Sequence, residues 1–393
     1  MRILFCTAEA PVPPVNGFRL QLIHLCRELA KRHEVSVLTF APDPPGEPPP
    51  GVELITVKAP PVGGLANRVS AHLRGTVHGV PSSIGRFGVP MEREMRRLLE
   101  TRSFDVVHVT NGSMASLGDI VAPIPAIIAL LDAWHVNVEA ERMVAPLALR
   151  PLYRLEERRV RRFCSHAFRS FGRAIMVTEQ DAVAARELDP TLRIEAIPNG
   201  VDGEEFAPNP SVEPEPGHIV FTGAMHWAPN VNAARSLALE ILPRVRAVRP
   251  DARLSLVGRS PSSDVLELGE LEGVHVTSEV PDVRPWLWSA EAYACPMWTG
   301  TGIKNKLLEA LACARPVAAT PLACQGIRVA DGREVLVAGS EQDMADALVR
   351  LLGDAELRAR LARGGREHVR RYHAWERVAA EYERVYAEVI AEA

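Results

Sequence analysis

Apolar and polar positions follow two different periods along the first half of the chain. Short apolar runs of strand length, such as 2–8 (RILFCTA) and 33–40 (HEVSVLTF), are separated by a longer segment, 18–32, whose apolar side chains recur at helical spacing. Further apolar runs follow at 104–112 (FDVVHVTNG) and 126–132 (AIIALLD). Strands that alternate with helices in this way predict a parallel sheet with helices on both of its faces.

This alternation stops at residues 194–217, which are rich in proline, glycine and acidic residues, and it restarts at 218–224 (HIVFTGA). Residues 354–393 have helical spacing throughout, with an interruption expected at 363–365 (RGG). Two doubly wound α/β domains in tandem account for this pattern. The predicted division is a first domain over 1–203, a linker over 204–217, a second domain over 218–372 and a terminal helix over 373–393.

One segment of the second domain has the features of an anion site. Residues 300–312 read GTGIKNKLLEALA, so two glycines and two lysines precede the apolar face of a helix. The start of a helix has unpaired N–H groups and the positive end of the helix dipole, and it binds phosphate readily. The alternative is a solvated helix start in which Lys306 and Glu309 form an ordinary surface pair.

Composition and the length of the apolar runs argue against several classes of protein. The formal net charge is −4 and 47% of the residues are hydrophobic, so charge gives no sign of nucleic-acid binding. Six scattered cysteines without a C-x-x-C motif favour reduced thiols over a disulfide framework or a zinc site. The apolar start of the chain is too short for a secretory signal, and the longest apolar run, 120–131, is too short to span a membrane. We therefore expect a cytoplasmic protein.

Known phosphate-binding motifs are absent, but a set of ordered motifs identifies a family. The chain has neither the G-x-G-x-x-G fingerprint nor a P-loop. The segments 196–206 (AIPNGVDGEEF), 221–234 (FTGAMHWAPNVNAA), 300–320 (GTGIKNKLLEALACARPVAAT) and 372–375 (YHAW) resemble the retaining GT-B glycosyltransferases of family 4.

The resemblance implies a GT-B fold, in which two Rossmann-like domains enclose a cleft. It also implies transfer of a sugar, with retention of configuration, from a nucleotide diphosphate donor to an acceptor hydroxyl. The donor is then expected on the second domain and a small-molecule, glycan or lipid-linked acceptor on the first. The terminal helix is expected to return to the first domain. The family needs no metal and no cofactor beyond the donor substrate. An epimerase acting on nucleotide sugars with the same fold, or a non-catalytic partner protein, remains an alternative.

The family's donor site can be carried over residue by residue. Glu309 matches the second glutamate of an E-x7-E motif, which implies that it binds the ribose hydroxyls of the nucleotide. Backbone amides at Gly302 and Ile303 are then expected to meet the donor phosphates and sugar. Lys304 or Lys306 would neutralise the departing diphosphate as its charge develops. Lys306 is the favoured catalytic cation because it lies on the same helix face as Glu309.

The sequence departs from the family pattern at two places. Thr301 stands where the first glutamate of the E-x7-E motif is expected, which leaves the identity of the donor sugar open. The loop after the first strand of the second domain contains Gly223 and His226 but lacks the usual basic pair. Gly223 would let that loop approach the donor closely, and the lysines further along are expected to compensate for the missing charge.

In the first domain, Asn16 and Gly17 match a glycine-containing loop that passes close to the donor phosphates, and Arg19 could add charge to it. An ordinary turn before a helix is the alternative. Asp132 and His135 follow a buried strand and are candidates to orient or deprotonate the acceptor hydroxyl. His108 is a further acceptor-side candidate, although a histidine after a strand is commonly structural. In same-face substitution the leaving phosphate can itself take the acceptor proton, so no enzymic base is required.

A basic amphipathic segment spans Arg150–Arg173. Val160, Phe163, Ala167 and Phe171 form an apolar stripe along it at helical spacing. Such a helix can dock peripherally on the anionic inner face of a membrane. The alternative is that the stripe packs into its own domain and leaves the arginines in solvent.

Overall fold

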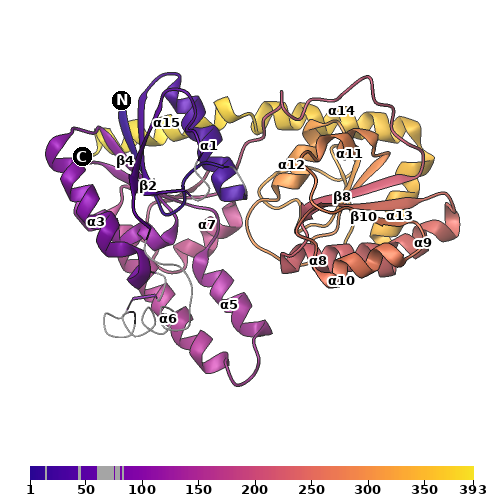
Figure 1. The fold of residues 1–393 in the computed structure, drawn as a ribbon, viewed down its shortest axis with the longest axis horizontal. Helices are drawn as coiled ribbons and strands as arrows, with labels where there is room; N and C mark the ends of the chain where they lie inside the picture. The colour runs from indigo at the N-terminus through magenta and orange to yellow at the C-terminus, as the bar shows by residue number, and fades with distance from the viewer. Residues whose placement is uncertain (14–15, 43–45, 60–74, 76–79, 82–83) are drawn as a thin grey trace. The chain divides into compact units, whose positions relative to one another are not determined.

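The chain folds as two compact units that each contain one sheet (Figure 1). The computed structural model describes residues 1–13, 16–42, 46–59, 75, 80–81 and 84–393. The first unit comprises Met1–Pro198 together with Val378–Ala393, and the second comprises Asn199–Arg377. Both sheets are wholly parallel and packed by helices, which confirms the predicted α/β class. Within the described part of the chain, no helix combines the length and the apolar character needed to span a bilayer.

The sheet of the first unit has seven strands in the order β3-β2-β1-β4-β5-β6-β7. Strands β4 and β5 are buried along their whole length, and this explains why they read as unbroken apolar runs rather than as alternating ones. The strands are β1 (Arg2–Thr7), β2 (Glu34–Phe40), β3 (Val52–Val57), β4 (Val106–Thr110), β5 (Ala126–Leu130), β6 (Arg173–Met176) and β7 (Ile194–Ala196).

Helices of the first unit connect successive strands of its sheet. The helix α1 begins directly after Asn16, whose side-chain Oδ1 accepts a hydrogen bond from the backbone N–H of Arg19 at 2.9 Å and so caps the first turn. The other helices are α3 (Ile84–Thr101), α4 (Gly118–Val121), α5 (Trp134–Val144), α6 (Arg150–Ala167) and α7 (Glu179–Arg186), and α1 itself spans Gly17–Ala30.

The last helix, α15 (Trp375–Ala391), contributes its residues from Val378 onward to the first unit. Tyr382 and Tyr386 of this helix are fully buried there, next to His108 of β4. The core of the first unit is therefore built from residues that are more than 270 positions apart in sequence, since His108 and Tyr386 differ by 278.

The sheet of the second unit has six strands in the order β10-β9-β8-β11-β12-β13. Its strands are β8 (His218–Ala224), β9 (Arg253–Arg259), β10 (Val274–Val276), β11 (Ala292–Cys295), β12 (Val317–Ala319) and β13 (Leu336–Val337). Its main helices are α8 (Ala228–Arg235), α9 (Leu242–Val248), α10 (Ser263–Leu266), α11 (Arg284–Ser289), α12 (Asn305–Ala312), α13 (Glu341–Gly353) and α14 (Ala355–Tyr372).

The expected interruption at 363–365 is wrong, because α14 runs through both glycines without a break. A Cβ placed on Gly365 would lie 2.6 Å from the Cδ2 atom of Leu311, and one on Gly364 would lie 2.5 Å from the carbonyl oxygen of Arg333. These glycines therefore allow α14 to pack closely on α12 and on the loop before β13. The two glycines at 364 and 365 therefore indicate close packing of α14 on its neighbours and not the end of a helix.

Candidate functional site

The glycine-rich segment forms a tight loop between β11 and α12. Gly300 and Gly302 have φ angles of +107° and +66°, in the left-handed region that favours glycine. The turn brings Lys304, the residue before α12, back over the loop, and its Nζ donates hydrogen bonds to the carbonyl oxygens of Gly300, Thr301 and Gly302 at 3.4, 2.9 and 2.7 Å. Lys304 thus holds the loop in shape, and its ammonium group points at carbonyls instead of an open anion site.

Lys306 lies in the first turn of α12, and its side chain has different partners from that of Lys304. Its Nζ donates a hydrogen bond to Oδ1 of Asn230 at 2.5 Å and lies 4.3 Å from the centroid of the Phe221 ring. Asn230 in turn donates from Nδ2 to the carbonyl oxygen of Ala224 at 3.0 Å, which anchors it to the end of β8. Burial lowers the pKa of Lys306 to about 8. The side chain is therefore a mostly protonated cation at neutral pH, held at the carboxyl edge of the sheet.

Gly223 is required at this point because the lysine and the asparagine leave no room for a side chain. A Cβ on Gly223 would lie 2.7 Å from Nζ of Lys306 and 2.8 Å from Nδ2 of Asn230. The loop that begins here carries no basic residue, and its His226 is exposed. Trp227 is also exposed, to 60% of its surface. The cation that lies against this loop is therefore Lys306 of α12, and its compensation for the missing basic pair stays a prediction.

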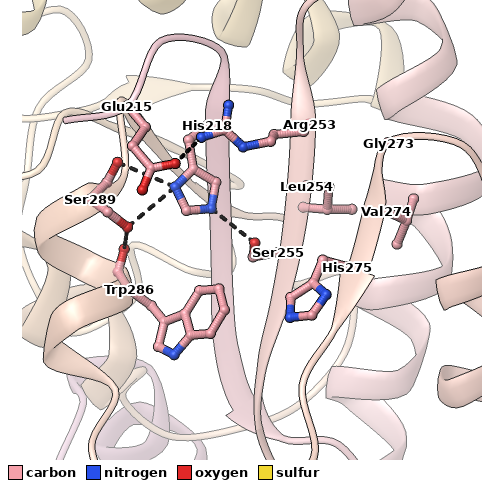
Figure 2. A pocket seen from close by; sticks show the side chains of 10 residues that line it. All are labelled: Glu215, His218, Arg253, Leu254, Ser255, Gly273, Val274, His275, Trp286 and Ser289. Atoms are coloured by element: carbon pink, nitrogen blue, oxygen red, sulfur yellow. Dashed lines mark hydrogen bonds and ion pairs between the residues drawn. The ribbon is translucent and has the colours of Figure 1, made fainter.

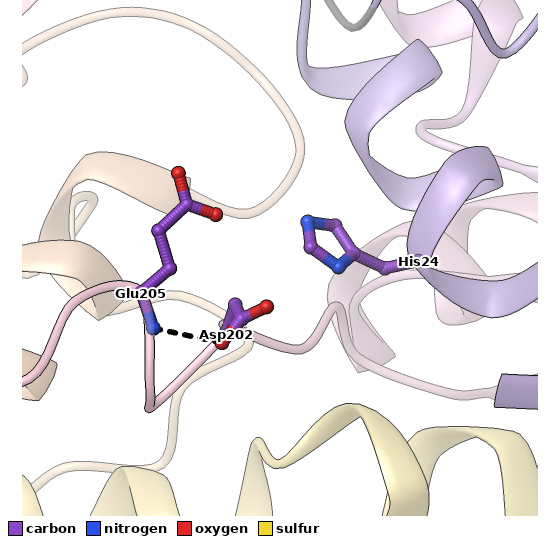
Figure 3. A group of neighbouring side chains, drawn as sticks. All are labelled: His24, Asp202 and Glu205. Carbon is purple, nitrogen blue, oxygen red and sulfur yellow. Dashed lines mark hydrogen bonds between the residues drawn. The ribbon is translucent and has the colours of Figure 1, made fainter. Parts of the chain in front are cut away.

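Glu309 lies one turn further along α12 than Lys306. Burial raises the pKa of its carboxyl group to about 7, although the charge of Lys306 acts in the opposite direction. Glu205 also raises the pKa of Glu309 by its negative charge. Glu205 belongs to a turn in which the carboxylate of Asp202 accepts hydrogen bonds from the backbone N–H groups of Glu204 and Glu205 at 3.1 and 2.9 Å. Figure 3 shows the second of these bonds.

Taken together, the predicted donor residues of the second unit gather at one edge of its sheet. Gly223 ends β8, and the loop from Gly300 to Lys304 leads from β11 into α12. Ligands of open parallel sheets bind at this carboxyl edge. Ile303 is half-buried and packs against the core of the unit. Sequence reasoning missed Asn230 and Phe221, which hold Lys306, although both lie in the family-like segment 221–234.

The carboxyl edge of the first sheet holds a second set of predicted residues. Asn16 donates from Nδ2 to the carboxylate of Glu9 at 3.0 Å, and Arg19 donates from Nε to the same oxygen at 3.0 Å. Glu9 thus neutralises Arg19, which adds less charge to the loop than the sequence suggested. Gly17 is the first residue of α1 and follows the capping asparagine directly.

His108 fills the interior of the first unit. It is 1% exposed, its Nδ1 lies 2.6 Å from the hydroxyl of Tyr386, and its ring lies 5.2 Å from that of Tyr382 in a stacked arrangement. Burial lowers the pKa of His108 to about 3, so the ring is neutral. This position favours a packing role over the acceptor-side role expected from the sequence, because a residue enclosed by its own core offers no face to a substrate.

Asp132 and His135 follow β5 at the carboxyl edge, where the sequence placed them. Asp132 is half-buried, while His135 lies in the first turn of α5 and is only 3% exposed. Burial is the main cause that lowers the pKa of His135 to about 4, and the charge of Arg161 adds to the effect. A histidine with this pKa is a weak base at neutral pH.

The opposite edge of the second sheet has a cavity of about 350 Å³ that no sequence motif pointed to (Figure 2). It lies at the amino ends of β8, β9 and β10, away from α12. His218 bonds Ser255 through Nε2 at 2.8 Å and lies 3.2 Å from the carbonyl oxygen of Ser289 through Nδ1, and His275 stacks on Trp286. His218 and the two serines thus already satisfy one another. Considered unit by unit, the described residues contain no group of three histidine, cysteine or carboxylate side chains spaced as metal ligands.

Solved structures with this architecture define the fold. The chain superposes on sucrose-phosphate synthase from Thermosynechococcus elongatus with a TM-score of 0.76 and 15% identity over 100% of both chains. It superposes on Anabaena Alr3699/HepE, in complex with UDP and glucose, with a TM-score of 0.68 and 14% identity over 99% of this chain and 100% of that one. The two units therefore form a GT-B glycosyltransferase fold, as the sequence predicted.

Sequence comparison then gives the family. The family model for Glycosyltransferase Family 4 matches residues 15–205, and the model for Glycosyl transferases group 1 matches residues 216–354. A phosphatidyl-myo-inositol mannosyltransferase of Mycolicibacterium smegmatis is 28% identical over 99% of this chain and 94% of its own length. The chain belongs to the group 1 glycosyltransferases of the family 4 type.

Proposed function

We propose that this protein transfers a sugar from a nucleotide diphosphate donor to an acceptor hydroxyl, with retention of anomeric configuration and without a metal ion. The observation that carries the proposal is the position of Lys306. Its ammonium group is held by Asn230 against Gly223, at the sheet edge where parallel α/β units bind ligands, and Glu309 follows one turn later.

The chemistry of these groups suits the two ends of a nucleotide diphosphate. Lys306 and the free N–H groups at the start of α12 would attract the diphosphate and neutralise the charge that develops on it as the glycosidic bond breaks. Glu309, when ionised, can accept hydrogen bonds from both hydroxyls of a ribose. Lys304 would keep the Gly302 and Ile303 amides in place by holding the loop. A cation that belongs to the chain can do the work that a divalent ion does in other transferases.

Retention is proposed from the family resemblance, and the two candidate histidines of the first unit are poorly suited to act as a general base. The pKa of about 4 makes His135 a poor proton acceptor at neutral pH, and His108 is enclosed in the core. The leaving diphosphate then takes the proton of the acceptor hydroxyl on the same face of the sugar from which it departs. In this reaction the bond from C1 to the diphosphate oxygen breaks and the bond from C1 to the acceptor oxygen forms on that face.

For the substrates, we propose a mannosyl donor and an inositol-bearing lipid acceptor as the first pair to test. The relative from Mycolicibacterium smegmatis is named a phosphatidyl-myo-inositol mannosyltransferase and aligns with nearly the whole chain. UDP-glucose is the second donor to test, because the Anabaena protein was crystallised with UDP and glucose.

The test is a transfer assay with radiolabelled donors in the presence of a chelator. We expect a glycosylated lipid whose anomeric configuration, read by NMR, equals that of the donor, and we expect roughly a 100- to 1000-fold lower rate with Lys306→Met. Lys31→Met is the matched control, because Lys31 pairs with Glu28 on α1 and lies outside the proposed site. Isomerised donor without transfer would favour an epimerase, and binding without turnover would favour a non-catalytic protein.

A further inference from the structure

The turn between α5 and α6 has an unusual concentration of exposed apolar side chains. Leu147 is 76% exposed, Leu152 is 50% exposed and Leu155 is 45% exposed. Met143 and Leu149 are exposed as well. The two helices pack side by side in the first unit and their turn is at one end of the pair (Figure 1). Exposed apolar groups gathered in this way mark an interaction site more often than an ordinary solvated surface.

This surface differs from the apolar stripe that the sequence suggested. Val160 is fully buried, Ala167 and Phe171 are 7% exposed, and Phe163 packs against the core of the first unit. The second half of α6 therefore uses its stripe to join its own unit. The first half of α6, together with the preceding turn, is what remains uncovered.

The exposed charges of α6 next to these leucines are of one sign. Arg154, Arg158 and Arg162 recur every four residues on α6, are exposed, and have no ion pair among the residues that the structure describes. The two glutamates of α6 are both engaged by other arginines, since Glu156 pairs with Arg159 and Glu157 pairs with Arg142 and Arg161. The outward face thus combines leucines with uncompensated arginines.

Arg150 is not part of this outward charge. Its guanidinium group donates hydrogen bonds to the carbonyl oxygens of Ala145 and Met143 at 3.2 and 3.1 Å. Both carbonyls lie at the carboxyl end of α5, where a cation stabilises the helix. Arg150 therefore fixes the turn that presents Leu147 and Leu149.

We propose that the α5–α6 turn docks on an anionic lipid bilayer, with Leu147, Leu149 and Leu152 entering the interface and Arg154, Arg158 and Arg162 meeting the lipid phosphates. A helix with leucines and arginines on one exposed face suits the boundary between headgroups and acyl chains. A second copy of the chain fits less well, because a symmetric dimer through this surface would bring like charges together. The docking does not depend on the proposed donor chemistry.

The test is flotation of the purified full chain with vesicles of neutral lipid alone or with about 30% anionic lipid, at low and at high salt. We expect binding only to the anionic vesicles and a strong decrease at high salt, because salt screens exposed charges. Each arginine at an anionic surface strengthens binding roughly fivefold, so the triple variant Arg154→Gln, Arg158→Gln, Arg162→Gln should bind on the order of 100-fold more weakly.

Matched controls distinguish the contribution of this surface to vesicle binding from the contributions of net charge and of exposed leucines in general. Arg360, Arg363 and Arg370 are exposed arginines of α14, and their triple change to glutamine removes the same charge from the second unit. Leu147→Ser with Leu152→Ser should weaken vesicle binding by roughly tenfold or more, whereas Leu239→Ser with Leu266→Ser, at exposed positions of the second unit, should not.

Several outcomes would overturn the proposal. The wild type could fail to float with anionic vesicles, or the α14 variant could lose binding as strongly as the α6 variant. A concentration-dependent dimer that Leu147→Ser dissociates, without vesicle binding, would instead identify a second copy as the partner. Circular dichroism and melting temperature of each variant show that the fold is retained, so that a loss of binding is assigned to the surface.

Discussion

Replacing Lys306 with methionine is the sharpest perturbation that the second unit offers. The change keeps an unbranched side chain of similar length and removes the ammonium group that donates to Asn230 and lies over Phe221. Burial lowers the pKa of Lys306 to about 8, so the folded protein holds this charge at a cost. We therefore expect the free variant to be at least as stable as the wild type at neutral pH. Affinity for a nucleoside diphosphate should fall.

The size of the loss can be estimated. Truncating one partner of a desolvated charge pair costs about 2–5 kcal/mol, so affinity should weaken roughly 30-fold or more. At a nucleotide concentration of about 100 times Kd, the wild type gains about 2.7 kcal/mol. For units of this size each kcal/mol moves the melting temperature by about 2–4 °C, which predicts a shift of about 5–11 °C. The same concentration should stabilise the variant by under about 1 kcal/mol and move its melting temperature by only about 2–3 °C.

Differential scanning fluorimetry with UDP, GDP, ADP and TDP measures these shifts directly. Lys31→Met should keep the full shift, since its ammonium pairs with Glu28 in the first unit. Lys306→Arg keeps the charge and should retain part of the shift. An undiminished shift in Lys306→Met would refute the assignment of the diphosphate to α12. No shift in the wild type with any of the four nucleotides would refute a nucleotide diphosphate donor.

Three further predictions concern the loop, the pH dependence and the core of the first unit. Lys304→Met should lower the free energy of unfolding by roughly 1.5–3 kcal/mol in urea titrations, because three loop carbonyls lose a charged donor. Nucleotide affinity measured by calorimetry should be highest between pH of about 7 and about 8: Glu309 loses its charge below its raised pKa of about 7, and Lys306 loses its charge above its lowered pKa of about 8. An affinity that stays constant from a pH of about 6 to about 9 would contradict the assignment of Lys306 to the diphosphate and of Glu309 to the ribose. Tyr386→Phe removes the only hydrogen-bond partner described for the buried His108 side chain and should cost about 1–3 kcal/mol of stability without changing the nucleotide shift.

Much of the fold could be predicted because its strands are buried on both faces. Runs such as 126–132 and 218–224 are apolar without alternation, which is how strands of a covered parallel sheet read. The exception at 363–365 has a physical reason. Two adjacent glycines weaken a helix in isolation, but here the missing side chains allow α14 to approach Leu311 and Arg333, and tertiary packing outweighs the local preference.

The candidate site was predictable in position but not in the direction of its side chains. The sequence grouped Lys304 with Lys306 as possible phosphate cations, and spacing alone could not separate them. The left-handed glycines at 300 and 302 turn the loop so that Lys304 reaches its carbonyls, while Lys306 reaches across to Asn230, which is 76 residues away. His108 could not be placed either, because its partners on α15 come from the far end of the chain.

The electrostatics of α12 connect these observations to function. Lys306 has a lowered pKa and Glu309 a raised one, so burial disfavours the charged form of both, and each only partly relieves the other. A bound diphosphate would favour the charged lysine, and the hydroxyls of a ribose would favour the charged glutamate. Binding a nucleotide should therefore offset the unfavourable free energy of holding these two charges in the empty site. Lys306→Met should raise the melting temperature of the free protein while reducing its response to the ligand. Both effects in one variant would distinguish a site built for a ligand from a lysine that is merely buried, for which the first effect alone is expected.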